Sequence, residues 1–387
     1  MASQQESFSL YLHIPYCIRK CPYCDFNVQV VRRIPEADYT TALIKELEVH
    51  ALSECWRSRS LRSIFFGGGT PSVFAPQSIG KILEKAAALF SFEEGIEISL
   101  EANPDPADTK HFSGYRSCGV NRLSLGAQSF QPHLLRFLGR LHTADETREA
   151  LRAILKAGFE NFNVDLIYAS PGQSLSDLSA DLEETLSFHP PHLSAYGLTI
   201  EEKTIFYRQY RAGKISPLPE EEEVAMAELI EEALAGVGLE RYEISNYARP
   251  GWQARHNVNY WQGGDYLGVG AGAHSHQRIG DCIAHRWQNE RHPPRYMARI
   301  ASEGRAVAEE ERTDRHQTAA EFMFLGLRMT LGISVEEFSR RFGKNPAEFY
   351  PAIRDWLEDG LMEENAERLR LTRRGLLVAN SIFVNFV

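Results

Sequence analysis

The chain has 387 residues, enough for one large domain and one smaller domain. Its formal net charge of −10 disfavours broad, charge-driven binding to nucleic acid, and we expect no nucleic-acid partner. Six cysteines are too few for a disulfide scaffold in a chain of this length. No apolar leader and no run of about 18 apolar residues is found, so we expect a cytoplasmic protein.

The first 200 residues alternate strand-like and helix-like segments. Strands are expected over residues 7–14, 63–66, 96–101, 122–126, 162–168 and 192–198. Amphipathic helices are expected between them, over residues 39–52, 76–89, 144–157 and 174–188. Strands that alternate with helices build a parallel sheet covered by helices, so the pattern predicts an α/β fold, a TIM-like partial (β/α)6 barrel. The chemistry of such barrels lies at the C-terminal ends of the strands.

The pattern changes after the barrel. A long acidic helix is expected over residues 219–235, within a barrel domain that spans 1–240. We expect an irregular segment over residues 241–310. Residues 311–387 predict three helices, the second beginning at Ser334, then a hairpin over 361–372 and a helix over 373–383. Three helices and a hairpin resemble a small winged-helix domain.

Three clustered cysteines follow the first predicted strand. Cys17, Cys21 and Cys24 have the spacing C-x3-C-x2-C, which lets three thiolates hold three irons of a [4Fe–4S] cluster and leaves the fourth iron open. A zinc site completed by His13 or Asp25 is one alternative, although zinc ligands usually come as two separated pairs. A redox pair of Cys21 and Cys24 is another, but it leaves Cys17 unexplained. The compact triplet favours the cluster.

Glycine and polar residues follow the later strands. Residues 67–72 read Gly-Gly-Gly-Thr-Pro-Ser, and glycines permit close approach of a ligand to the backbone, although a tight turn also explains them. Glu101, Gln128 and Asp165 lie on the third, fourth and fifth strands or just beyond them. Each alone also fits a helix cap or a satisfied buried polar group. Because strand ends of a barrel meet at one mouth, we expect the three side chains to share a pocket.

The cysteine run resembles the signature of the radical S-adenosylmethionine (SAM) superfamily, and the glycine run resembles its GGGTP motif. This resemblance implies that the open iron chelates SAM. It implies that the glycine motif contacts the methionine part, that Glu101 and Asp165 accept ribose hydroxyls, and that Arg140 pairs with the carboxylate. A surface arginine is the alternative for Arg140. The SAM-binding residues implied are Tyr11, Tyr23, Gly68, Gly69, Thr70, Glu101, Gln128, Arg140 and Asp165.

Longer stretches of sequence resemble one particular family within this superfamily. Residues 11–17, 123–130, 242–248 and 266–274 together resemble the oxygen-independent coproporphyrinogen III oxidases and their relatives, over nearly the whole chain. The oxidases of this family carry a fourth cysteine two residues past the third, where this chain has Phe26. The pattern C-x3-C-x2-C-D-F is instead that of the family's heme chaperone branch.

The run His256-Asn-Val-Asn-Tyr-Trp resembles the HNxxYW motif of that branch. The resemblance implies a heme site with His256 as an iron ligand and Tyr260 and Trp261 as flat apolar surface. A packing motif that braces the open side of the barrel is the alternative. In another motif, Ala169-Ser170 stands where the family commonly has Gly-Leu, but Pro171 and Gly172 are kept, so we expect the loop shape to survive.

The resemblance implies a heme chaperone that carries a [4Fe–4S] cluster and SAM, binds heme and delivers it to an apo-hemoprotein. A respiratory membrane enzyme is the expected acceptor, which would place the chain at the membrane surface during delivery. A homodimer is a further expectation. Oxidative decarboxylation of coproporphyrinogen III is the alternative function. A nucleic-acid-modifying radical enzyme is a third, which the acidic charge disfavours.

Overall fold

Residues 7–386 are described in the computed structural model. Six parallel strands form its centre, and they pair in chain order. They are β1 (Phe8–Ile14), β4 (Ser60–Gly68), β5 (Ser91–Ala102), β6 (Arg122–Gln128), β7 (Asn161–Tyr168) and β8 (His192–Gly197). All six predicted strands are therefore present, and the predicted partial barrel is confirmed.

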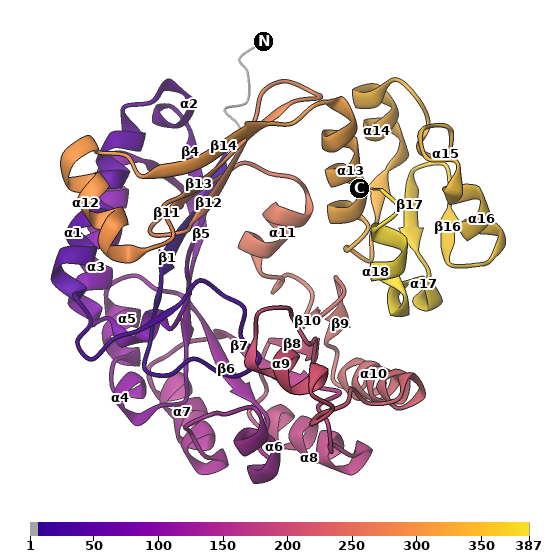
Figure 1. The fold of residues 1–387 in the computed structure, drawn as a ribbon, viewed down its shortest axis with the longest axis horizontal. Coiled ribbons are helices and arrows are strands. Elements are labelled where there is room, and N and C mark those ends of the chain that lie inside the picture. Colours follow the sequence, from indigo (N-terminus) through magenta and orange to yellow (C-terminus); the bar gives the residue numbers. More distant parts are fainter. Residues whose placement is uncertain (1–6, 387) are drawn as a thin grey trace.

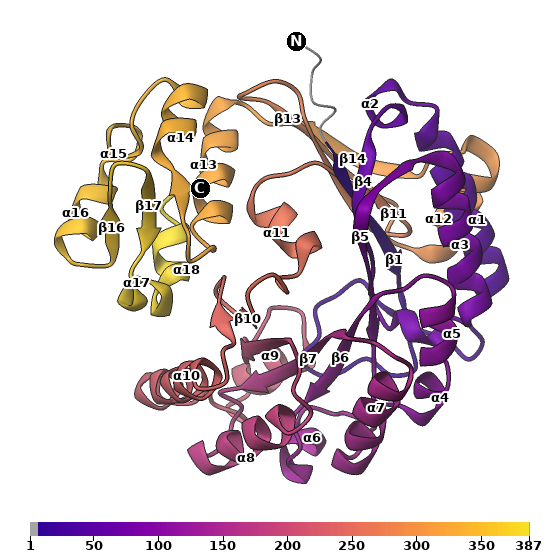
Figure 2. The same ribbon diagram turned by 180° about the vertical axis from the view of Figure 1, so that it is seen from behind.

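Helices cover the outer face of this sheet (Figures 1 and 2). The longer ones are α1 (Glu36–Ala51), α3 (Pro76–Leu89), α7 (Ala144–Lys156), α8 (Leu175–Leu186) and α10 (Glu220–Ala235). Reciprocal capping boxes begin two of them, with Thr143 and Glu146 at α7 and with Ser174 and Asp177 at α8. The apolar stripes of these helices pack with the inner strands in one continuous core.

Shorter elements connect these units. They are β2 (Tyr16–Cys17), β3 (Gln29–Val30), α2 (Glu54–Arg57), the 3-10 helix Pro71–Val73, α4 (Pro106–Thr109), α5 (Phe112–Ser117), α6 (Pro132–Phe137) and α9 (Ile205–Arg211). No helix within residues 7–386 is both long enough and apolar enough to cross a membrane.

The segment 241–310 is more regular than expected. It contains α11 (Arg255–Trp261), β11 (Tyr266–Val269), β12 (His274–Arg278), β13 (Ala284–Asn289), α12 (Pro293–Glu303) and the start of β14 (Val307–Arg312). Strand β11 pairs in parallel with β1, and β12 to β14 continue the sheet in antiparallel fashion. At the opposite edge, β9 (Glu240–Arg241) and β10 (Asn246–Ala248) pair next to β8. The strands are short and rich in glycine and polar residues, so their pairing comes from tertiary context that local patterns do not contain.

The C-terminal part has its own apolar core, which includes Met323, Phe338, Phe342 and Leu369. Its elements are α13 (Arg315–Gly326), β15 (Ile333–Ser334), α14 (Val335–Phe342), α15 (Pro346–Phe349), α16 (Ala352–Glu358), β16 (Met362–Glu364), β17 (Arg368–Leu371), α17 (Arg373–Leu377) and α18 (Ala379–Phe383). The predicted hairpin is the β16–β17 pair, to which β15 adds a third strand. The single helix expected over 373–383 is instead two helices, because Val378 leaves helical geometry at φ −112°.

Helix α11, which carries the HNxxYW run, lies between the barrel sheet and the C-terminal domain (Figures 1 and 2). It therefore fills part of the side on which the partial barrel is open.

Candidate functional site

A cavity of about 460 Å³ opens at the C-terminal ends of the barrel strands. Its wall combines the loop that holds the three cysteines with the ends of β4, β5, β6 and β7. The sequence-predicted residues that line it are Cys17, Cys21, Tyr23, Cys24, Gly68, Gly69, Thr70, Glu101, Gln128, Arg140 and Asp165. Residues from five separate motifs thus meet in one place.

The three cysteine thiols are free and part-buried at the edge of this cavity. Thr70 Oγ1 donates to Cys17 Sγ at 3.3 Å, and Arg140 Nη1 lies 3.6 Å from Cys21 Sγ. Burial raises the pKa of Cys17 to about 11, and burial likewise raises the pKa of Cys24. Because soft thiolate ligands suit iron–sulfur clusters, three thiols beside hydrogen-bond donors and an open cavity fit a [4Fe–4S] cluster.

The glycine run presses against the strand that leads to the cysteines. Gly69 N donates to Ile14 O at 2.8 Å, and Thr70 N donates to Tyr16 O at 2.8 Å. A Cβ on Gly69 would lie 2.6 Å from Tyr16 O, which is backbone and cannot move aside. Gly68 has φ +109°, and a Cβ there would lie 2.4 Å from the His13 ring. Both positions therefore require glycine, and the run serves as a tight turn as well as part of the cavity wall.

Two carboxylates, Glu101 and Asp165, lie in the cavity wall. Gly68 N donates to Glu101 Oε2 at 3.2 Å, while Asn163 Nδ2 donates to Asp165 Oδ1 at 2.7 Å. Burial and the neighbouring Asp165 raise the pKa of Glu101 to about 8, and burial also raises the pKa of Asp165. At neutral pH Glu101 is therefore mostly protonated, so that it can donate as well as accept a hydrogen bond from a ligand hydroxyl.

Arg140 belongs to the cavity wall and is not a surface arginine. Its Nη2 donates to Asn103 Oδ1 at 2.6 Å and to Gly126 O at 2.9 Å. Asn103 Nδ2 in turn donates to Thr70 Oγ1 at 3.0 Å, which links Arg140 to the cysteine contacts. Sequence reasoning missed Asn103 as a site residue, although it stands only two positions after Glu101 at the end of the same strand.

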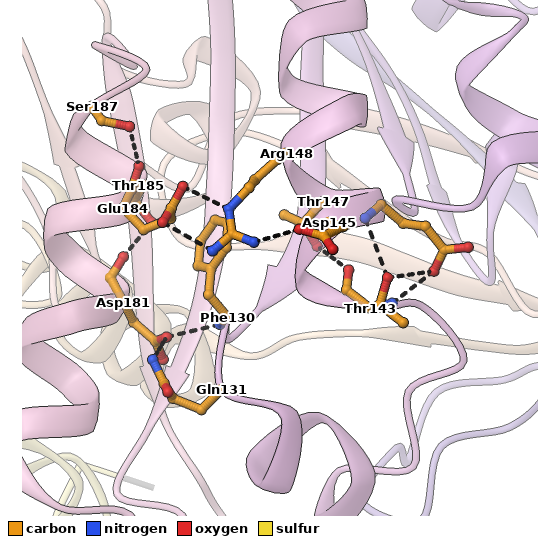
Figure 3. Close-up of polar contacts among 11 residues, drawn as sticks. Phe130, Gln131, Thr143, Asp145, Thr147, Arg148, Asp181, Glu184, Thr185 and Ser187 are labelled. Atoms are coloured by element: carbon orange, nitrogen blue, oxygen red, sulfur yellow. Dashed lines mark hydrogen bonds and ion pairs between the residues drawn. The ribbon is translucent and has the colours of Figure 1, made fainter.

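Gln128 ends β6 in a left-handed conformation, with φ 66°. The loop that follows it is anchored by Asp181 of α8, as Figure 3 shows. Phe130 N donates to Asp181 Oδ1 at 2.8 Å, and Gln131 Nε2 donates to the same oxygen at 3.1 Å. Ser129 Oγ donates to Asp181 Oδ2 at 2.6 Å. This anchoring offsets the backbone strain and holds the Gln128 side chain at the cavity.

Ala169 has φ 57°, a left-handed conformation that favours glycine. The turn after β7 needs a left-handed backbone at this position, which explains why the family commonly has glycine there. In this chain an alanine adopts the same conformation. Gly172 also has a positive φ, 82°.

Helix α11 turns one side toward the interior of the barrel. His256 is 1% exposed, with Nδ1 2.9 Å from Ser63 Oγ and Nε2 2.9 Å from Tyr260 Oη. Burial lowers the pKa of His256 to about 3, so the ring is neutral. Both ring nitrogens are thus paired within the protein. Trp261 lies elsewhere, with the Arg328 guanidinium 4.4 Å from its ring centroid.

A smaller cavity of about 170 Å³ lies between α11 and the sheet, lined by Tyr11, His256 and Tyr260 among others. It shares part of its lining with the cysteine cavity, namely Glu101, Ser124, Asp165 and Tyr196. Tyr11 therefore lines the smaller cavity alone, whereas Glu101 and Asp165 line both cavities.

Comparison with known proteins identifies the family. The radical SAM superfamily model matches residues 11–185, and the HemN C-terminal domain model matches residues 313–378. A heme chaperone HemW from Haemophilus influenzae is 36% identical over 98% of this chain and 97% of its own length. The chain belongs to the HemW family. HemW of Escherichia coli is 34% identical and HemW of Bacillus subtilis is 33% identical, each over 98% of this chain.

HemW family membership agrees with the architecture of solved structures. The Escherichia coli coproporphyrinogen III oxidase HemN, described as a radical SAM enzyme, superposes with a TM-score of 0.82. At 23% identity, over 100% of this chain and 91% of that one, it shows the shared fold. The radical SAM fold implies a [4Fe–4S] cluster and SAM, and the thiols and cavity described above fit both.

Proposed function

We propose that this chain is a heme chaperone, which binds heme and delivers it to apo-hemoproteins. The observation that carries the proposal is full-length similarity, at 33–36% identity, to relatives that bear this name. The chain also has Phe26 where the oxidases of the family have a fourth cysteine, and that side chain is 61% exposed beside the cysteine loop.

In this proposal Cys17, Cys21 and Cys24 hold the cluster, and SAM occupies the adjoining cavity. The cluster supplies one-electron chemistry when it is bound. The residues of the chain bind and orient SAM. Glu101 and Asp165 meet the ribose hydroxyls, and the glycine run meets the methionine portion. The remaining SAM contacts in the proposal come from Tyr23, Gln128 and Arg140, which line this cavity, whereas Tyr11 lines the smaller cavity next to it.

Decarboxylation of coproporphyrinogen III remains the second candidate, because the fold superposes on HemN over the whole chain. The two functions make opposite predictions. The protein is purified without oxygen and its cluster is reconstituted; hemin binding is followed by absorbance, and porphyrinogen turnover is assayed with SAM and a reductant. Heme binding without decarboxylation supports the chaperone, whereas decarboxylation with turnover contradicts it. A Cys17→Ser, Cys21→Ser, Cys24→Ser variant is expected to lose the absorbance of the cluster.

We further propose that the chain docks on an anionic membrane surface through residues 17–33, next to the cluster. Four large apolar side chains of this segment face solvent: Ile18, Phe26, Val30 and Val31. Four cations are exposed among them, Arg19, Lys20, Arg32 and Arg33, against one exposed acid, Asp25. Apolar groups interleaved with cations suit the interface of a membrane with anionic lipids, and they stand out on a chain of net charge −10.

Vesicle sedimentation tests this surface. The protein is expected to sediment with vesicles that contain phosphatidylglycerol and to stay free with pure phosphatidylcholine. Arg32→Gln with Arg33→Gln should weaken binding about tenfold or more, because each cation near such a surface contributes about 1 kcal/mol. Val30→Ser with Val31→Ser should also weaken it. Leu52→Ser, at a site that is 78% exposed outside the segment, is the matched control. Concentration-dependent dimerisation through residues 17–33, with no vesicle binding, would contradict the proposal in favour of a second copy of the chain.

A further inference from the structure

A second large cavity, of about 540 Å³, lies on the other side of α11 from the cysteines. It is walled by the N-terminal parts of β4 and β5, the strand β9, the start of α11 and the loop that follows α13. Its lining residues are Arg62, Glu93, Glu240, Arg241, Tyr242, Gly251, Gln253, Arg255, Val258, Asn259, Met329, Thr330 and Leu331. Its volume is in the range of small-molecule and cofactor sites, about 300–1,000 Å³.

Three arginines of this cavity have no ion-pair partner among residues 7–386. Arg62 Nε donates to Ser7 Oγ at 2.9 Å, and Arg255 Nη1 donates to Gly95 O at 2.9 Å. Arg241 binds backbone carbonyls, including Ile244 O from Nε at 3.1 Å. Each guanidinium has five donors, so all three keep donors for an anionic ligand. Glu93 and Glu240 also line the cavity and leave a net positive charge of one.

The loop after α13 adds two apolar side chains, one of them a thioether, to the wall beside Arg241. Met329 and Leu331 belong to the loop after α13, which is fixed to the barrel. Thr330 N donates to Tyr242 O at 3.0 Å, and Glu243 and Met329 form a β-bridge. A thioether is one of the ligands that proteins offer to heme iron. Cationic donors together with apolar and thioether groups in one cavity suit a flat dicarboxylate with a metal at its centre.

Helix α11 connects this cavity to the HNxxYW run. His256 and Tyr260, at positions i and i+4, face the barrel and pair with each other. Arg255, Val258 and Asn259, at positions i, i+3 and i+4, line the second cavity. The histidine thus braces the helix from inside, while Arg255, just before the motif, and the two x positions of the motif form part of the cavity wall.

We propose that heme, an iron porphyrin dicarboxylate, binds in this second cavity, with its propionates on Arg62 and Arg255 and its iron facing Met329. The assignment rests on the proposed chaperone function. It gives the heme a site apart from that of the cluster and SAM, at the junction of the barrel and the C-terminal domain.

The test compares two porphyrins on the full-length protein with its cluster reconstituted. Hemin carries iron and both propionates, whereas protoporphyrin IX carries the propionates alone. Met329→Leu should weaken hemin binding about tenfold and leave protoporphyrin IX unchanged, since it removes only the iron ligand. Arg62→Gln and Arg255→Gln should each weaken both porphyrins about tenfold, because each removes a charge-assisted hydrogen bond. Met297→Leu and Arg354→Gln are matched controls outside the cavity and should change neither.

The outcomes separate the two proposals. Wild-type protein that binds neither porphyrin would contradict the chaperone function itself and the cavity with it. Wild-type protein that binds hemin, with Met329→Leu and both arginine variants unchanged, would overturn the cavity alone. So would His256→Gln if it removed the iron-dependent part of the affinity while Met329→Leu did not. Circular dichroism of each variant checks that the fold is retained.

Discussion

Single residues fix the geometry of the cysteine cavity. Gly69 does so because it has no side chain, which lets the backbone pass close to its neighbours. A Cβ on Gly69 would lie 2.6 Å from Tyr16 O, in β2, and 2.8 Å from Ile14 O, at the end of β1. Gly69→Ala should lower the free energy of unfolding by about 1–3 kcal/mol, measured by urea denaturation, because overpacking against backbone cannot relax locally.

Gly236→Ala is the matched control for that variant. Its added Cβ would meet nothing closer than 3.4 Å, at the end of α10 where the backbone is helical. It should leave stability unchanged or raise it by up to about 1 kcal/mol, since alanine restricts the unfolded chain. Equal effects of the two variants would contradict the account of the glycine run.

Glu101 is expected to make stability depend on pH. Its pKa rises from an ordinary value of 4.5 to about 8 in the folded protein, because it is buried and faces Asp165. Between these values the unfolded chain releases a proton that the folded chain keeps. The contribution of Glu101 to the free energy of unfolding is therefore complete below pH 4.5. It falls as pH rises toward 8, by at most about 1.4 kcal/mol per pH unit.

Glu101→Gln should remove this dependence, because the amide keeps an acceptor for Gly68 N and cannot titrate. Urea midpoints at pH 5, 6, 7 and 8, without SAM, should show the variant gaining on the wild type as pH rises. Glu149→Gln, on the exposed side of α7, should follow the wild type at every pH. Parallel curves for wild type and Glu101→Gln would contradict the raised pKa.

At the scale of elements, the sheet and its covering helices were predictable from sequence, and the elements at its edges were not. The central strands have apolar runs with helices between them, so local pattern and tertiary context agree. Strand β11 has four residues and takes its place by pairing with β1, as between Leu10 and Leu267, and with β12. A one-residue break at Val378 likewise turned one expected helix into two.

Some of the cavity residues were likewise predictable from sequence and others were not. Cysteines, glycines and strand-end carboxylates were predictable, because parallel strand ends converge and the motif spacings are specific. Asn103 was missed, since one amide gives no pattern of its own. The pairing of both His256 nitrogens with Ser63 and Tyr260 could not be read from the HNxxYW run, because Ser63 lies on β4, far away in the sequence.

Helix α11 also contacts the C-terminal domain, through Trp261. The Arg328 guanidinium covers the Trp261 ring and lies 3.7 Å from Glu243 Oε2, and the Glu243 side chain is buried. Arg328→Ala should lower the free energy of unfolding by about 2 kcal/mol, between the values typical of exposed and of buried pairs, because a buried carboxylate loses its cation.

A second substitution separates charge from packing. Adding Glu243→Gln to Arg328→Ala should recover part of the loss, since no stranded charge remains. Arg354→Ala, an exposed arginine of α16, should change stability by less than about 0.5 kcal/mol. If the double variant had a lower free energy of unfolding than Arg328→Ala alone, the charge explanation would be wrong.

At the scale of the whole molecule, the cysteine cavity and the second cavity lie on different sides of α11, and the exposed apolar and basic segment 17–33 lies next to the cysteines. A decarboxylase must bring its porphyrin to the SAM cavity, whereas the proposed carrier need not. In a carrier, cluster and heme can occupy separate places, with the heme held between the barrel and the C-terminal domain.

Transfer of heme tests the central claim most directly. Protein loaded with one equivalent of hemin is mixed with a heme-free globin as acceptor, and the rise of the globin absorbance is followed with and without coproporphyrinogen III, SAM and a reductant. A heme chaperone should pass its heme to the globin and leave coproporphyrinogen III unchanged. Retention of the heme, or conversion of coproporphyrinogen III with turnover, would contradict the account.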